Sequence, residues 1–211
     1  VRKIISDVLF PCFCVKCNQE GGWWCQDCLQ KNKPNYFKFK VTTEPKEVVA
    51  LFNYKENNPV GKLIKKYKYN YASSIEKVWQ EILSQSFVNT NLKNYFKGRV
   101  IIPVPLYKKR LRFRGFNQAA VLAKFCAKLS GSDFNDSLVR SKNTKAQARL
   151  SEAERRKNLI DAFKWSSNSA VPKKVIIVDD VYTTGATMQE CVKVLRESGA
   201  KKVGGFVLAR G

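Results

Sequence analysis

Histidine is absent from the sequence, and acidic residues are scarce. Without histidine the chain has no Ser-His-Asp or Cys-His catalytic group and no imidazole metal ligand, so any proton transfer must use a carboxylate, Lys, Tyr or water. The 17 acidic residues face 39 Lys and Arg, which gives a formal net charge of +22. Such a charge attracts nucleic acid, anionic membrane surfaces and phosphorylated small molecules. The lysines as a class also have a plainer explanation, since a Lys-rich composition simply fills solvated positions.

Long apolar runs are also absent. No segment approaches the roughly 20 apolar residues that span a bilayer. The first ten residues begin with basic side chains, but Ser6 and Asp7 interrupt the apolar stretch and Cys12 follows at once, unlike a secretory signal. The sequence therefore predicts a cytoplasmic protein. Its 211 residues, 44% of them hydrophobic, predict one globular α/β domain with a small appendage.

Five of the seven cysteines fall between residues 12 and 28. Cys14 with Cys17, and Cys25 with Cys28, form two C-x-x-C pairs, which together supply the tetrahedral shell of a structural Zn²⁺. The reducing cytoplasm disfavours the alternative of a disulfide pair. A redox motif is disfavoured because neither pair lies in a βαβ context. Cys12 forms a C-x-C with Cys14 and is an alternative first ligand.

The surroundings of the cysteines predict a small separate module. Trp23 and Trp24 are expected to cover the metal site, with base stacking by either ring as the alternative. Residues 31–46 are polar and Lys-rich and are typical of a linker or an irregular strand pair. We therefore predict a zinc-binding module and linker over residues 1–46 and a second domain over residues 47–211.

The second domain shows alternating strand and helix patterns. This alternation predicts a mainly parallel sheet with helices on both faces. The region 140–150 lacks apolar periodicity and is predicted to be a long mobile loop, and Ser151 with Glu154 forms a capping box that opens a helix. The expected strands cover 48–52, 99–105, 175–178 and 203–208, and the expected helices start near Pro59, cover 75–83, start near Asn117 and end at Gly199.

The most informative stretch follows the apolar strand 175–178. Asp179 and Asp180 come first, and their carboxylates suit two vicinal sugar hydroxyls. The Thr- and Gly-rich loop after them begins a helix, whose unpaired N–H groups form an anion cradle. In open α/β sheets, ligands bind just beyond the carboxyl ends of strands. A 5-phosphorylated ribose fits this arrangement, with its phosphate on Thr183, Thr184, Gly185, Ala186 and Thr187.

Other phosphate motifs fail on detail. A Walker loop needs Gly-Lys-Ser/Thr, and a dinucleotide fingerprint needs three spaced glycines. A purely structural acidic turn would explain the acidic pair but not the whole run of residues 183–187.

These residues carry a resemblance to known families. Residues 179–187 resemble the phosphoribosyl-diphosphate signature of type I phosphoribosyltransferases. Residues 110–118 resemble the R-L-R-x-R-G-F-N-Q block of the competence protein F (ComF/ComFC) family, as do residues 144–158 and the N-terminal cysteine pairs. Tyr107 departs from the pattern, because many members have His there.

The resemblance implies a fold and a set of ligand contacts. The fold is that of a type I phosphoribosyltransferase with an N-terminal zinc module. The ligand is phosphoribosyl diphosphate with Mg²⁺, whose diphosphate contacts Arg110, Arg112 and Arg114, while residues 142–156 form a hood over it. Arginine suits this role because its planar fork binds phosphate oxygens bidentately. The alternative is that these arginines are solvated or bind a DNA backbone.

The resemblance also implies a role in DNA uptake during natural transformation. The chain would bind incoming single-stranded DNA in the cytoplasm, with a peripheral place at the cytoplasmic membrane beside the uptake machinery as a further option. The alternative is an active phosphoribosyltransferase with an unidentified acceptor. Purine salvage members carry an Asp where this chain has Thr183, which argues against that reaction.

Overall fold

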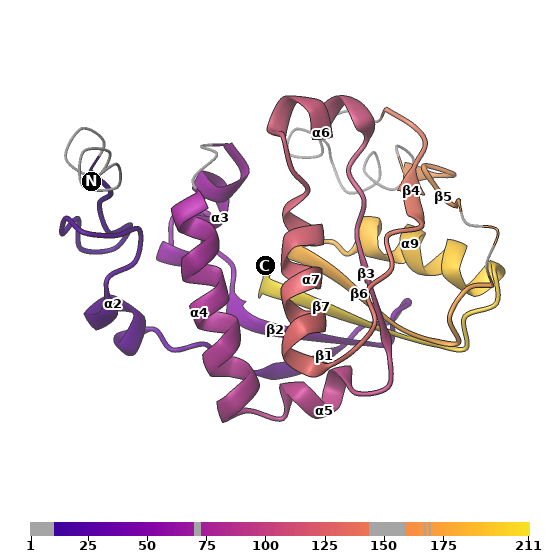
Figure 1. Ribbon diagram of the computed structural model, residues 1–211, viewed down its shortest axis with the longest axis horizontal. Helices are drawn as coiled ribbons and strands as arrows, with labels where there is room; N and C mark the ends of the chain where they lie inside the picture. Colours follow the sequence, from indigo (N-terminus) through magenta and orange to yellow (C-terminus); the bar gives the residue numbers. More distant parts are fainter. Residues whose placement is uncertain (1–10, 70–72, 144–158, 167, 169) are drawn as a thin grey trace.

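The main sheet has five strands in the order β1-β2-β7-β6-β3, and all but β1 run parallel (Figure 1). The computed structural model describes residues 11–69, 73–143, 159–166, 168 and 170–211. Strands β4 and β5 pair antiparallel in a separate two-stranded sheet. The strands are β1 (Phe37–Lys40), β2 (Glu47–Asn53), β3 (Val100–Pro103), β4 (Leu138–Arg140), β5 (Phe163–Trp165), β6 (Lys174–Tyr182) and β7 (Lys202–Arg210).

Helices cover both faces of the main sheet. Helices α3, α4, α5 and α7 share a core with one face, whereas α9 packs on the other. The predicted α/β class with a mainly parallel sheet is thereby confirmed. The described helices are α2 (Gln26–Lys31), α3 (Pro59–Tyr69), α4 (Ser73–Asn89), α5 (Leu92–Phe96), α6 (Lys108–Arg114), α7 (Gln118–Ser130) and α9 (Ala186–Glu197).

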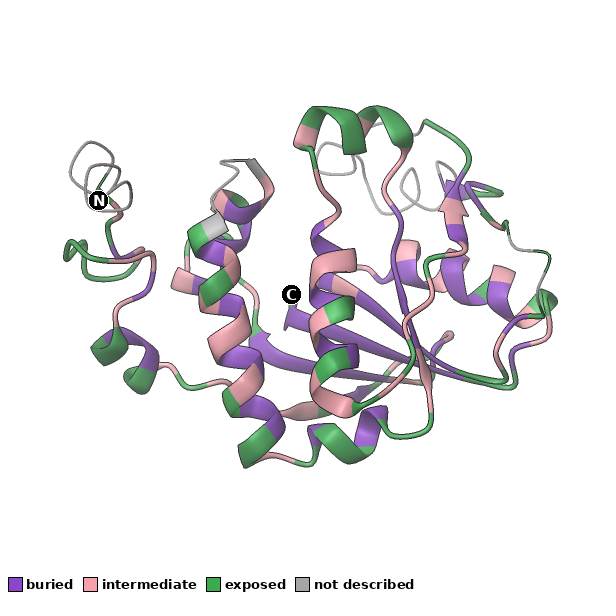
Figure 2. Ribbon diagram, viewed as in Figure 1, coloured by how far each residue is buried: buried purple, intermediate pink, exposed green. Residues whose placement is uncertain are grey.

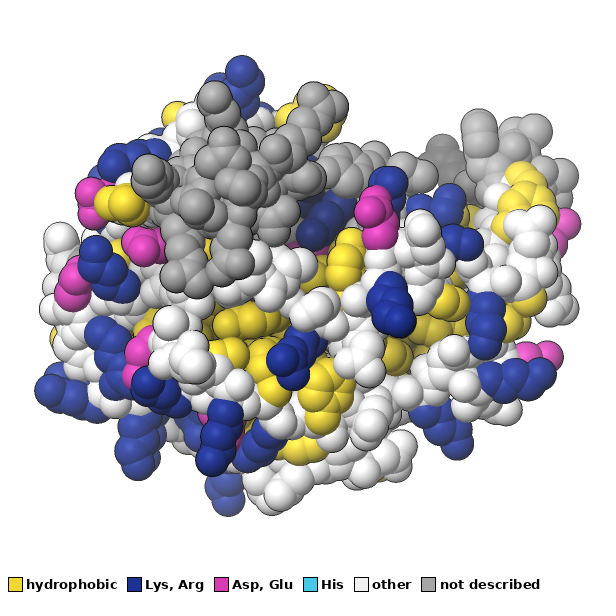
Figure 3. Space-filling view, turned by 180° about the vertical axis from the view of Figure 1, so that it is seen from behind, with side chains coloured by type: hydrophobic (Ala, Val, Ile, Leu, Met, Phe, Trp, Pro, Cys, Tyr) yellow, Lys and Arg dark blue, Asp and Glu magenta, His cyan; other side chains and the backbone are white. Residues whose placement is uncertain are grey.

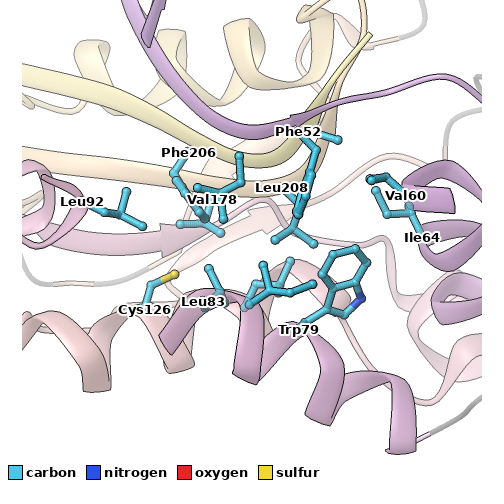
Figure 4. Close-up of a cluster of buried hydrophobic side chains, with 14 of the residues drawn as sticks. Phe52, Val60, Ile64, Trp79, Leu83, Leu92, Cys126, Val178, Phe206 and Leu208 are labelled. Atoms are coloured by element: carbon cyan, nitrogen blue, oxygen red, sulfur yellow. The ribbon is translucent and has the colours of Figure 1, made fainter. Parts of the chain in front are cut away.

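The apolar run of β6 is continuous because both of its faces are buried. Successive side chains of a strand point to opposite faces. Ile176 and Val178 therefore join the core under α4 and α7, and Val175 and Ile177 join the core under α9. Figure 4 shows the first core, where Val178, Phe206 and Leu208 of the sheet face Trp79 and Leu83 of α4.

Two segments differ from the sequence-based expectation. The arginine-rich segment predicted as a loop is the helix α6, which starts after Tyr107 and ends where Gly115 takes the left-handed conformation with φ +81°. All of α6 is at least partly exposed (Figure 2), so no apolar stripe marked it as a helix. Strand β1 pairs with β2, so part of the predicted linker lies in the main sheet.

The cysteine-rich segment packs against the α/β unit. Cys14, Trp24, Cys28 and Leu29 belong to the same core as Phe52 and α3. The rings of Trp24 and Phe52 lie 5.9 Å apart. The division at residue 46 remains a prediction, since the module shares this core.

Among the residues that the structure describes, no helix combines the length and the apolar character that crossing a bilayer would require.

Candidate functional site

The four cysteines of the two C-x-x-C pairs converge on one point. Their sulfur atoms all lie within 4.8 Å of one another. Zn–S bonds of about 2.3 Å in a tetrahedron place the sulfurs about 3.8 Å apart, so the cluster has the dimensions of a zinc site. Four sulfur ligands are also the donor set that zinc prefers in structural sites. The group consists of Cys14, Cys17, Cys25 and Cys28.

Hydrogen bonds support this cluster and assign a different role to Cys12. The backbone N–H of Cys25 donates to Cys14 Sγ at 3.5 Å. Burial opposes ionisation of Cys14, but backbone N–H groups from Cys17 and Cys25 lower its pKa to about 6. Cys12 lies outside the sulfur cluster, and its carbonyl accepts from the N–H groups of Gly21 and Gly22. The geometry therefore places Cys14, and not Cys12, in the sulfur cluster.

A pocket of about 390 Å³ opens at the carboxyl end of β6. Asp179, Asp180 and all of residues 181–188, from the end of β6 to the first turn of α9, line it, as the position at the end of a parallel strand predicts. Gly185 takes a left-handed conformation at the N-cap of α9, and Thr184 Oγ1 accepts from Ala186 N–H at 3.4 Å. The first-turn N–H groups of α9 therefore stand ready for an anion.

Asp179 and Asp180 lie within β6 rather than after it, so strand alternation directs their side chains to opposite faces of the sheet, while their carboxyl groups remain close enough to interact. Asp180 Oδ2 pairs with Lys68 Nζ at 2.6 Å, on the side of α3. Asp179 shares the other side with α9, and its Oδ1 accepts from the Asp180 N–H at 2.8 Å. The pocket lies at the carboxyl end of β6 and has lining residues on both faces of the sheet.

These surroundings separate the acidities of the two residues. Burial raises the pKa of Asp179 well above its usual range, and the charge of Asp180 adds to the rise. Burial alone would raise the pKa of Asp180 too, but the Lys68 ammonium more than offsets it, so the pKa of Asp180 is lowered. The same pairing outweighs desolvation at Lys68 and raises its pKa. The pocket therefore holds one stable carboxylate beside one that resists ionisation.

The three predicted arginines lie on α6 and do not line this pocket. Arg114 donates to Gln118 Oε1 at 2.6 Å, and its charge contributes to lowering the pKa of Asp180. After burial, the charge of Arg110 is the next cause that lowers the pKa of Arg140, to about 10. The structure thus brings Arg114 near Asp180, and Arg110 near Arg140. Arg112 lies between them on α6 and contributes to neither of these two pKa shifts. Residues 144–156 of the predicted hood lie outside the described residues.

Sequence reasoning missed several residues of the site. Tyr54 and Glu56 line the pocket from the segment after β2, where the end of a parallel strand was an available signal. Lys68 and Arg140 had no local signal, because their importance comes from elements distant in sequence. Asn117, part of the quoted block, is the N-cap of α7: its side chain accepts from Ala119 N–H and donates to the Val104 carbonyl.

Replacing Gly185 with Ala should destabilise the loop. A Cβ there would lie 2.2 Å from Tyr182 Oη, and the positive φ of +76° adds strain of about 1–2 kcal/mol. Because 1 kcal/mol shifts the melting temperature of a chain this long by about 2–4 °C, we expect a fall of at least that size in calorimetry. Gly131→Ala is the matched control, with φ +69° and open space around the site. An equal fall in both variants would contradict the role of the Tyr182 contact.

The fold and the loop together define a phosphoribosyltransferase-type domain. Residues 120–211 match the family model of the phosphoribosyl transferase domain. The pocket-lining segment 179–188 falls inside this match.

Curated relatives define the family more closely. The chain is 32% identical to competence protein F of Haemophilus influenzae over 207 residues, covering 95% of this chain and 85% of that protein. It is 30% identical to competence protein ComFC of Streptococcus pneumoniae, covering 88% and 87%. It is 29% identical to DNA utilization protein YhgH of Escherichia coli O157:H7, covering 88% and 77%. The chain belongs to the competence protein F (ComF/ComFC) family.

Proposed function

We propose that the chain binds phosphoribosyl diphosphate in the pocket at the end of β6 and acts in DNA uptake for natural transformation. One observation carries the binding half: an acidic pair and a helix N-terminus with an adjoining Thr-Gly loop line one pocket. Its volume of about 390 Å³ lies in the range of small-ligand pockets, about 300–1,000 Å³. The names of the relatives motivate the uptake half.

Each predicted residue has a role in this proposal. Asp179 and Asp180 accept hydrogen bonds from the ribose hydroxyls. The loop receives the 5-phosphate on Thr183, Thr184, Gly185, Ala186 and Thr187. Mg²⁺, when bound with the ligand, neutralises diphosphate charge. The diphosphate faces α6, which supplies Arg110, Arg112 and Arg114.

Lys68 has a further role that the ion pair suggests. Its ammonium covers Asp180 Oδ2, which is buried and has no hydrogen-bond donor among the described residues apart from this ion-pair partner. A sugar hydroxyl that reaches this oxygen has to share it with Lys68. In the ligand-free chain, Lys68 therefore keeps Asp180 ionised and balances the negative charge of the Asp180 carboxylate.

The proposed partners of the chain are single-stranded DNA, the uptake machinery and a structural zinc ion. The chain binds incoming single-stranded DNA in the cytoplasm, peripherally at the inner membrane beside the uptake machinery. The zinc of the N-terminal cluster is structural, since four cysteines leave no open coordination position. The charge of +22 favours a polyanionic partner.

An active phosphoribosyltransferase is the alternative. Tyr54 and Glu56 line the same pocket as the loop, and in this alternative the acceptor contacts them. Thr183 provides no carboxylate for a purine nitrogen. Diphosphate release with a candidate base would establish this alternative, and its absence with all candidates would leave a binding protein.

Calorimetric titration tests the proposal. We expect phosphoribosyl diphosphate with Mg²⁺ to bind with a stoichiometry of one, and a single-stranded oligonucleotide to bind with a strong dependence on salt. Repeating each titration with the other ligand present measures any coupling between the two sites. Absence of heat with phosphoribosyl diphosphate would contradict the first half, and oligonucleotide binding that is flat across salt would contradict the second. Ribose 5-phosphate without Mg²⁺ serves as the control for the phosphate cradle alone.

A further inference from the structure

A second hollow lies between the cysteine module and α3. It measures about 790 Å³ and shares no lining residue with the pocket at β6. Lysines line it from both sides, Lys16 from the module and Lys62, Lys65 and Lys66 from α3, and of the described residues that line it none is acidic. We call this hollow the module groove.

Positive charge alone does not single out this groove. Figure 3 shows dark-blue Lys and Arg side chains scattered across the visible part of one face of the molecule. Lys65 also pairs with Glu56 at 3.6 Å, and both side chains are mostly exposed, so the pair contributes little. What distinguishes the groove is the combination of cations with aromatic rings.

Two aromatic rings lie among these lysines. Phe13 is 41% exposed, and Trp23 is half-buried. The Trp23 ring is held in place, because its Nε1 donates to Ser74 Oγ at 2.8 Å and Lys66 Nζ lies 4.7 Å from the ring centroid. Trp24, in contrast, is buried against Phe52. The two neighbouring tryptophans therefore differ in role: Trp24 anchors the module, and Trp23 lines the groove.

We propose that the module groove is the binding site for single-stranded DNA. Bases stack on Trp23 and Phe13, and phosphates contact Lys62 and Lys66. A single strand fits this chemistry because its bases are free to stack on aromatic side chains, whereas a duplex keeps them paired. The inference rests on the proposed function, since it gives a location to the DNA binding proposed there. It also places the DNA apart from the phosphoribosyl diphosphate pocket, with α3 contributing side chains to both.

Charge removal in the groove is the first test. The zinc-loaded full chain is titrated with a fluorescent oligothymidylate of about 15 nucleotides at several salt concentrations, a length near the upper site size of small single-strand binding folds. Each phosphate contact contributes about 0.7 to the slope of log affinity against log salt, so Lys62→Gln with Lys66→Gln should lower that slope by about 1.4. The control is Lys93→Gln on α5 with Lys97→Gln at the C-cap of α5. Both lysines are exposed, and α5 lies at the other end of α4 (Figure 1).

Ring removal is the second test. Trp23→Leu should weaken oligothymidylate binding about 10-fold, and Trp23→Phe should keep most of the affinity, because stacking is worth about 1–3 kcal/mol per base. Zinc content confirms that each variant keeps its module. Duplex DNA of the same length should bind more weakly than the single strand.

The outcomes separate this inference from the proposed function. If the wild-type chain binds no single-stranded DNA, the proposed DNA binding itself fails. If the wild-type chain binds it but the groove pair and the α5 pair lose equal affinity and slope, binding is a general charge effect and the groove assignment is overturned. A loss confined to the groove variants supports both.

Discussion

Removal of zinc should cost the N-terminal segment its fixed structure while the five-stranded sheet stays folded. The described part of the module has one short helix, α2, and buries two large apolar side chains, Trp24 and Leu29. Their burial is worth about 1.5–3 kcal/mol each. Structural zinc in small peptides contributes about 10–16 kcal/mol, so the ion outweighs the core of the module.

Hydrogen exchange measures this effect directly. With chelator present, amide protection over residues 14–29 should collapse to that of an unfolded chain, and protection in β6 and β7 should persist. Tryptophan emission should shift to the red, because Trp24 leaves Phe52. Acidification should release zinc as well, since the ligand thiolates must then be protonated.

Two cysteine variants provide the control. Cys28→Ser should lose zinc because it removes a ligand of the cluster. Cys12→Ser should retain it, because Cys12 contributes its backbone carbonyl and lies outside the sulfur cluster. Loss of zinc in both variants, or full protection of the module after chelation, would contradict the proposed site.

Adjacent substitutions at Asp179 and Asp180 should change stability in opposite directions. Asp180→Asn leaves the Lys68 ammonium without its partner, so we expect a loss of about 2 kcal/mol, or a melting temperature lower by about 4–8 °C. Asp179→Asn removes a carboxyl whose ionisation is disfavoured by burial and by the charge of Asp180, but it keeps an oxygen for the Asp180 N–H. Its melting temperature at neutral pH should therefore rise by a few degrees.

The pH dependence of both differences follows from the directions of the pKa shifts. The pKa of Asp179 is higher in the folded chain than its unfolded value near 3.8. Its protonated carboxyl therefore contributes fully to the free energy of unfolding below pH 3.8, and this contribution is lost as the pH rises through the pKa of the folded state. The pKa of Asp180 is lower in the folded chain than in the unfolded chain. Its carboxylate therefore stabilises the fold above the pKa of the unfolded state, and this stabilisation is lost as the pH falls through the pKa of the folded state. Both variants should approach wild-type stability in acid.

Ligand binding should fall in both variants although their stabilities diverge. A hydrogen bond to a charged acceptor is worth about 1.5–3 kcal/mol, so Asp180→Asn should bind phosphoribosyl diphosphate about 10- to 100-fold more weakly in calorimetry. The raised pKa of Asp179 disfavours its charged form, so Asp179→Asn should lose the smaller value of a neutral hydrogen bond, about 0.5–1.5 kcal/mol, or about 2- to 10-fold in affinity. An Asp179→Asn variant that is more stable than the wild-type chain and binds phosphoribosyl diphosphate with the same affinity would contradict the ribose-binding role. Equal destabilisation by both substitutions would contradict the opposite orientation of the two carboxylates.

Local patterns in the sequence determined the parts that depend on neighbouring residues. The apolar run before Asp179 predicted a buried strand, and the Thr-Gly loop predicted the start of α9. The two C-x-x-C spacings predicted the sulfur cluster. Each of these features is set within a few residues, because strand periodicity, helix capping and knuckle geometry are properties of short segments.

Tertiary structure decided what depends on residues far apart in the chain. Pairing of β2 with β7 and of β7 with β6 carries α3 to the end of β6, and this order brings Lys68 to Asp180. Folding of the module likewise chose Cys14 over Cys12 and turned Trp24 inward and Trp23 toward the lysines of α3. Side-chain spacing along a segment carries no information about which distant element will pack against it, so these contacts had no signal in the sequence.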